Sequence, residues 1–481
     1  MAINYGSNNI TTTGKITSNA IDIVDGSNTL YYWSNGSGGW ATTSNWWLDY
    51  DHTIPADRIP NDKDIARIHS GVTNLGGGQY IKAKTIIVED GGYFNYETSI
   101  FGDVYFYGST YISAGQIVGN ATFYDTSYLN YGGSGNSPVI TGEAIFNNTS
   151  YFNNGGATYI GTKLIFNDDS HPFTSNIGGS IYCPNTVING TDTCANTYYG
   201  NVSVTSIFSL DIGSSTSVIT YIYGGDFILY NNNRISGGIG PHAGVKIYDG
   251  GSVTLNDFSS IADGSLLEFL NDDKKCYLIF NNNTANSIAT SNTTIAGDRL
   301  DIIVNTKVPT YGSMIGGGGN DIYCDTLIFN GESFLNGYSG WVVEKMIFNN
   351  DSYINTSFDN AQSFAFPIII FNDESYNDAT IICDLAVFND SSYNSGIIAD
   401  TYGNGNASFN DYSQNNYSCT VNGQAVFKGW SKNYGTIDGD AWFDEFSSHN
   451  TGGYVGNSAY YLGPYASNGG NDSSGYYQNW D

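Results

Sequence analysis

The chain has 481 residues; 60 are Gly, 39 are Tyr and 25 are Phe, and only 13% are charged. Its formal net charge of −29 argues against nucleic acids and anionic membranes as partners, because both require a basic surface. No stretch repeats apolar residues at helical spacing, so almost no helix is expected. The many turn-forming residues and 40% hydrophobic content favour an ordered all-β protein.

The N-terminal stretch has no basic segment followed by an apolar one, and no apolar run reaches the roughly 18 residues that span a membrane. We therefore expect a protein made in a host cytoplasm without a signal peptide. Its opening, NYGSNNITTTGKITSN, resembles the first residues of fibre and other structural proteins of tailed phages, especially marine ones. That resemblance implies an attachment or adaptor segment at residues 1–30 and a location on the virion surface.

Residues 31–74 are rich in tryptophan and resemble the entry segment of many parallel β-helix proteins. The segment places Trp33, Trp40, Trp46 and Trp47 before a short alternating strand. The resemblance implies an aromatic N-terminal cap, which a solenoid needs because its open end exposes apolar core and unpaired strand edges. The alternative is that the tryptophans form a platform on which sugars stack.

One sequence phrase recurs between residues 75 and 450: a small apolar residue, any residue, Phe, Asn, two polar residues, Ser and often Tyr. Constant internal spacing with variable linkers is typical of stacked structural repeats. We therefore predict an all-β parallel β-helix, or β-solenoid, with irregular turns (rungs) of roughly 16–23 residues and a cap at each end. Residues 200–320 are predicted to be degenerate rungs or an inserted lobe, and residues 451–481 a Gly- and Tyr-rich C-terminal cap or attachment segment.

Aligning the copies on Phe assigns a structural role to each position of the phrase. Alternation along the strand directs Phe inward, and the Asn that follows suits a corner because it tolerates left-handed backbone and its amides bond from rung to rung. The Ser is expected to point inward and bond the backbone, and the Tyr after it to form an outward ladder. The predicted structural ladder comprises Phe371, Phe388 and Phe409, Asn372, Asn389 and Asn410, and Ser375, Ser392 and Ser413. The outward Tyr353, Tyr376 and Tyr393 are candidate glycan contacts.

Acidic residues often stand two positions after Phe. Asp373, Asp390 and Asp411 occupy consecutive rungs, so their carboxylates form a column that repels itself unless it is hydrated or bridged. Ca²⁺ takes such oxygen ligands, which makes this column a calcium candidate. The alternative is solvated turn residues, and no other cofactor is predicted.

No catalytic constellation stands out. The six cysteines lack a CxxC pair, and four precede repeat strands as small buried residues would. A Cys183–Cys194 disulfide is the alternative, although folding in a cytosol argues against it. Nearly all acidic residues fall in repeat turns, so we expect no enzyme activity.

Three functions remain open. The first is a structural virion protein of a phage, either a fibre, a spike or a capsid-attached appendage, whose partners are other virion proteins and host-surface polysaccharide. The second is a β-helix polysaccharide depolymerase, and the third is a cellular surface adhesin or filament subunit. Either a single-chain solenoid or a homotrimer is compatible with the sequence.

Overall fold

The computed structural model places the repeats on a parallel β-solenoid. It describes residues 29–33, 39–68, 80–89, 91–94, 98–113, 115–130, 137–153, 156–172, 180–190, 197–204, 211–212, 219–230, 233–235, 244–256, 259–261, 265–270, 274–281, 287–289, 294–297, 299–306, 314–315, 321–335, 341–354, 366–400, 403–444, 446–462 and 465–477. The one helix in these ranges is a single 3₁₀ turn, η1 (Thr43–Asn45), and no helix there is long and apolar enough to cross a membrane. The chain divides into two compact units, Met1–Asn201 and Val202–Asp481, with the boundary inside β18 (Thr197–Val204).

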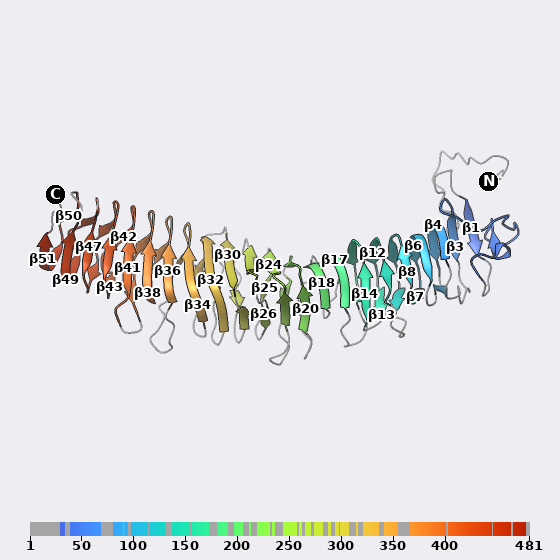
Figure 1. The fold of residues 1–481 in the computed structure, drawn as a ribbon, viewed down its shortest axis with the longest axis horizontal. Helices are drawn as coiled ribbons and strands as arrows, with labels where there is room; N and C mark the ends of the chain where they lie inside the picture. The colour runs from blue at the N-terminus through green and yellow to red at the C-terminus, as the bar shows by residue number, and fades with distance from the viewer. Residues whose placement is uncertain are drawn as a thin grey trace. The chain divides into compact units, whose positions relative to one another are not determined.

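The described strands of the first unit form two sheets. Its main sheet contains β1 (Leu30–Trp33), β2 (Trp46–Trp47), β3 (Ile65–Ile68), β4 (Tyr80–Val88), β6 (Ser99–Phe106), β8 (Gln116–Val118), β9 (Ala121–Phe123), β11 (Val139–Ile140), β12 (Glu143–Phe146), β14 (Ala157–Ile160), β15 (Lys163–Phe166) and β17 (Ser180–Ile188). Its second sheet contains β5 (Tyr93–Phe94), β7 (Tyr111–Ser113), β10 (Tyr128–Asn130), β13 (Tyr151–Asn153) and β16 (His171–Pro172). Successive strands lie side by side from blue to green in Figure 1.

The second unit repeats this plan. Its main sheet contains β20 (Ile219–Tyr223), β21 (Phe227–Leu229), β23 (Gly244–Tyr248), β24 (Ser252–Asn256), β26 (Leu266–Leu270), β27 (Cys276–Asn281), β29 (Thr294–Gly297), β30 (Leu300–Thr306), β32 (Asp321–Gly331), β34 (Trp341–Phe348), β36 (Phe366–Phe371), β38 (Thr380–Phe388), β40 (Ile397–Ala399), β41 (Asn406–Phe409), β43 (Thr420–Val421), β44 (Ala425–Phe427), β46 (Thr436–Ile437), β47 (Ala441–Phe443), β49 (Tyr454–Tyr461) and β51 (Asn471–Tyr477). Two shorter sheets contain β19 (Asp211–Ile212), β22 (Arg234–Ile235) and β25 (Ser260–Ile261), and β28 (Ser287–Ala289), β31 (Met314–Ile315), β33 (Phe334–Leu335), β35 (Tyr353–Ile354), β37 (Tyr376–Asn377), β39 (Tyr393–Asn394), β42 (Gln414–Asn415), β45 (Lys432–Asn433), β48 (Ser448–His449) and β50 (Ser467–Asn468).

Each rung turns a corner just after the core Phe. The strand ending in Phe lies in the main sheet, the Asn-to-Ser segment makes the corner, and a short strand then joins the shorter sheet. Phe371, Phe388 and Phe409 are fully buried, and their ring centroids lie 4.7 and 4.9 Å apart. Stacked aromatic pairs add about 0.5–1.5 kcal/mol to the burial of the rings themselves, so this column stabilises the corners of these three rungs.

The middle rungs are longer than predicted. Leu229 pairs with Leu255, and Val304 pairs with Phe329, so these turns span 26 and 25 residues. Their strands still pair in parallel and in register with those before and after, because Leu229, Leu255 and Val304 are buried at the position of the core Phe and Phe280 keeps that residue. The described residues between 219 and 306 are therefore rungs that have lost the phrase while keeping its alternation.

The parallel ladder also continues beyond residue 450, where the sequence phrase ends. Tyr461 pairs with Phe443 and is 4% exposed, so a Tyr replaces the core Phe. β51 then pairs in parallel with β49. The sequence phrase is not recognisable in this rung because its core position carries Tyr461 in place of Phe.

At the N-terminal end, three of the four tryptophans form a buried cluster. Trp33, Trp40 and Trp46 are at most 2% exposed, and their ring centroids lie 4.6–6.3 Å apart. β1 continues the parallel ladder by pairing with β3. Buried rings offer no face to a sugar, so the observed packing favours the cap over the platform. Residues 1–28 of the predicted adaptor lie outside the described residues.

Candidate functional site

The predicted Asp column lies at the corner, and it has a backbone role. Asp373, Asp390 and Asp411 have φ of 57, 56 and 55°, in the left-handed region that Asp, Asn and Gly tolerate best. The backbone N–H groups of Asn350 and Asp373 donate to Oδ2 of Asp373 and Asp390 on the following rungs, at 3.0 and 3.4 Å. These contacts explain acidic residues here without a metal.

No group of three or more metal-ligating side chains occurs within the described ranges, and calcium at this column stays a prediction. The left-handed residue lies one position later than predicted. The Asn after Phe makes the rung-to-rung ladder, and the following residue takes the positive φ.

The predicted Asn ladder is confirmed as a chain of amide hydrogen bonds. Asn389 donates to Oδ1 of Asn372 at 2.8 Å, and Asn410 donates to Oδ1 of Asn389 at 2.9 Å. Each side chain uses its NH₂ toward one neighbouring rung and its carbonyl toward the other. The corner amides are therefore engaged in stacking and leave little hydrogen-bonding capacity for a ligand.

The predicted Ser column is fully buried, as expected. Ser375 and Ser392 donate to the backbone carbonyls of Phe348 and Phe371, at 3.0 and 3.1 Å. The hydroxyl of Ser413 is equally buried but has no hydrogen-bond partner. The predicted bond to the backbone thus holds for the earlier rungs and not for Ser413.

The three tyrosines predicted to contact glycans form an outward, half-buried stack. Adjacent ring centroids in the column Tyr353, Tyr376 and Tyr393 lie 4.9 Å apart, with interplanar angles of 0 and 1°. Burial, followed by the neighbouring phenols, raises the pKa of Tyr376 to about 12. Because the rings cover one another's faces, this column meets solvent with ring edges and hydroxyls. A glycan contact here, which stays a prediction, would use hydrogen bonds rather than stacking.

The described cysteines are buried thiols, and none of them forms a disulfide with another described residue. Burial raises the pKa of the Cys419 thiol to about 11, and it also raises the pKa values of Cys324 and Cys383. Such thiols are poor nucleophiles, in keeping with their predicted role as small core residues. Cys194, one half of the alternative disulfide, lies outside the described residues.

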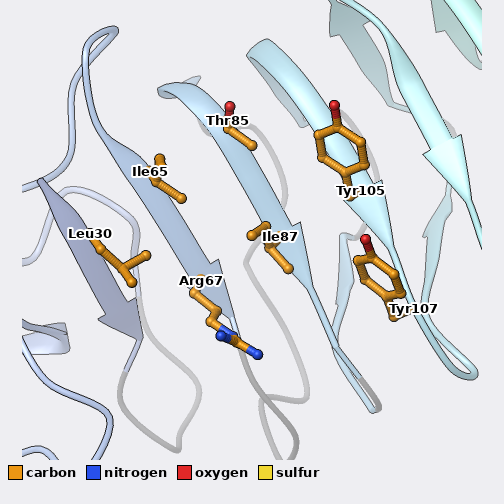
Figure 2. A pocket seen from close by; sticks show the side chains of 7 residues that line it. All are labelled: Leu30, Ile65, Arg67, Thr85, Ile87, Tyr105 and Tyr107. Carbon is orange, nitrogen blue, oxygen red and sulfur yellow. The ribbon is translucent and has the colours of Figure 1, made fainter. Parts of the chain in front are cut away.

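A small cleft of about 280 Å³ lies on the outer face of the first unit. Figure 2 shows its seven lining side chains side by side on adjacent strands of the main sheet. They are Leu30, Ile65, Arg67, Thr85, Ile87, Tyr105 and Tyr107. The Arg67 guanidinium forms an ion pair with Glu89, so its charge is already compensated. The volume is just below the range of roughly 300–1,000 Å³ for ligand pockets, so the cleft has room only for a small, largely apolar group.

Among the described residues, a column of exposed aromatic side chains lies at the corner of the last rungs. Three positions after the core Phe, earlier rungs carry Asp351, Glu374 and Ser391, whereas the last rungs carry an aromatic residue. Tyr412, Trp430 and Phe446 occupy this position, and Tyr465, four residues after the core Tyr461, continues their stack. We call these four residues the corner aromatic column. Their exposed fractions are 65, 51, 40 and 66%. Sequence reasoning missed the column, although the same alignment on Phe would have revealed the change from polar to aromatic.

Two ring contacts order this column. Trp430 and Phe446 stack with centroids 4.5 Å apart at 5°, and Phe446 and Tyr465 stack at 4.7 Å and 12°. Backbone bonds hold the corners in register: the N–H of Trp430 donates to the carbonyl of Asp411 and that of Phe446 to Gly429. The apolar surface is thus preorganised and remains in contact with water, which is typical of a binding surface.

Comparisons of the chain with protein-family models, with curated proteins and with solved structures found no match.

Proposed function

We propose that this chain is a structural, non-enzymatic protein of a tailed-phage virion: a fibre, a spike or a capsid-attached appendage. It is placed at the virion surface, where it contacts other virion proteins and presents aromatic surface to host polysaccharide. The phage-like opening of the sequence supports the viral assignment, and the solenoid supports the structural role. A homotrimer is the assembly we expect if the appendage follows the common three-fold plan.

One observation carries the structural role: the repeated positions are used for stacking one rung on the next. Phe packs on Phe, Asn bonds Asn, and the corner Asp bonds backbone, as Phe388, Asn389 and Asp390 do within one turn. A sequence that devotes its repeated side chains to stacking is suited to building a rigid scaffold. The residues that depart from the repeat are the ones left for recognition.

Mass spectrometry of gradient-purified particles, followed by imaging with an antibody against the chain, tests the proposal. The chain should copurify with infectious particles, and the antibody should label the tail or the capsid exterior. Its absence from particles would overturn the viral role. If the purified chain shortened host capsule or exopolysaccharide, the depolymerase alternative would replace the structural one; spontaneous filaments would favour the adhesin or filament alternative.

A further inference from the structure

The rung that carries Trp430 departs from the repeat at several neighbouring positions. Lys428 stands where the three preceding rungs carry the ladder Asn, Gly429 where those rungs carry the corner Asp, and Lys432 where they carry Tyr or Gln. Gly429 keeps the left-handed corner with a φ of 65°, so the fold is maintained while the carboxylate is lost. Residues 428–432 of this corner therefore contain two lysines and an indole and no carboxylate.

Both lysines are exposed, and neither makes an ion pair within the described ranges. This placement is unusual for a chain that has 16 Lys and Arg against 45 Asp and Glu. The adjacent rungs carry acidic residues at the same corner, Asp411 on the preceding rung and Asp444 on the following one. The positive charge is therefore confined to a single rung and bounded by negative charge on either side.

The indole of Trp430 supplies the apolar half of the surface. Phe446 covers one of its faces, no aromatic ring of the described residues stacks on the other, and half of the side chain is exposed. A sugar ring packs its C–H groups against such a face, while a carboxylate within reach pairs with lysine. Lysine and indole on the same turn favour a ligand that has both features.

We propose that Lys428, Trp430 and Lys432 bind an acidic sugar unit of a mostly neutral polysaccharide. The flanking Asp411 and Asp444 repel a polymer charged at every unit, which disfavours nucleic acids and polyuronates. A polysaccharide with spaced carboxylates places one acidic sugar on the rung that carries the lysines and neutral sugars over the adjacent corners. This inference rests on the proposed function and specifies the class of glycan and the residues that recognise it.

Affinity electrophoresis of the full chain tests the inference. The probes are soluble gellan, in which glucuronate is spaced by neutral sugars, carboxyl-reduced gellan, and polygalacturonate. Gellan should retard the chain, and added salt should reduce this retardation. The other two polymers should retard the chain at least about ten-fold less strongly than gellan does. Equal retardation by carboxyl-reduced gellan, stronger retardation by polygalacturonate, or no retardation by gellan would overturn the inference.

Variants that restore the repeat residues locate the site. Trp430→Ser, and Lys428→Asn combined with Lys432→Gln, should each weaken gellan binding about ten-fold while the melting temperature is maintained. Tyr80→Ser, whose side chain is 78% exposed in the other unit, and Lys163→Asn are matched controls that should bind as wild type does. Unchanged binding in the site variants would contradict the assignment.

Sedimentation of wild type and of Trp430→Ser tests the alternative that the corner aromatic column is an interface between copies of the chain. Both should sediment identically; self-association lost in Trp430→Ser would make the column an interface between copies and overturn the glycan site. Failure of gellan binding leaves the virion role standing, because that role is tested by particle composition.

Discussion

The side-chain amide of Asn394 donates to Oδ1 of Asn415 at 2.8 Å, and both side chains are fully buried. They belong to an interior ladder in which Asn377 donates to Asn394 and Asn415 to Asn433, at 2.8 and 2.9 Å. Earlier rungs carry apolar residues such as Ile354 at this position. The second unit thus replaces part of its core with a column of hydrogen bonds, each of which satisfies a group that burial would otherwise penalise.

Replacing Asn394 with Ala should destabilise the second unit by about 3 kcal/mol. The change leaves a donor of Asn377 and the acceptor of Asn415 buried without their partners, and each such group costs about 1–3 kcal/mol. Urea unfolding measures the loss, and hydrogen exchange should place it in β37, β39 and β42. Asn416→Ala, at a half-buried position outside this ladder, is the control and should cost under about 1 kcal/mol. Equal losses in the two variants would refute the ladder's importance.

Two serines in the same column should respond differently to truncation. Ser392→Ala removes a hydrogen bond to the Phe371 carbonyl and should cost about 1 kcal/mol. Ser413→Ala removes a buried hydroxyl that has no partner, so it should be neutral or stabilising. The urea midpoints of the two variants check this difference. A larger loss for Ser413→Ala would show that its hydroxyl is bonded.

Substitution of Asp390 separates its backbone role from calcium binding. Asp390→Gly keeps the left-handed corner and should cost less than Asp390→Ala, because Ala at positive φ is strained by about 1–2 kcal/mol. Thermal melts of both variants measure this order. Chelation provides the second comparison: if calcium binds the column, EDTA lowers the melting temperature of wild type and leaves Asp390→Gly unchanged. An unchanged wild-type melt would remove the calcium prediction.

Stability should fall at high pH through the Tyr376 stack. The folded pKa of about 12 exceeds the ordinary value of 10.0, so the unfolded chain loses this proton first as the pH rises. The stabilising contribution is therefore complete below about pH 10 and is lost between about pH 10 and pH 12. Urea unfolding at about pH 9 and about pH 11 should show a smaller decrease for Tyr376→Phe than for wild type. Identical decreases would contradict this coupling.

Sequence alone determined the architecture and the role of most repeated positions. Alternation fixes which side chains point inward, and because identical positions meet on neighbouring rungs, the Phe, Asn and Ser columns follow from aligning Phe371, Phe388 and Phe409. The interior ladder from Asn377 was also present in that alignment, but an Asn on an inward face was not anticipated because burial normally excludes it.

Only the tertiary structure decided what these columns expose. The positive φ of Asp390 depends on the path of the backbone at the corner. The two faces of the Tyr376 ring are covered by Tyr353 and Tyr393, which stack on it although the rungs differ in length. The same stacking leaves Trp430 half exposed, two residues from each of two exposed lysines. Sequence spacing specifies which residues share a column, whereas the separation and tilt of neighbouring rungs determine whether a side chain in that column is available to a partner.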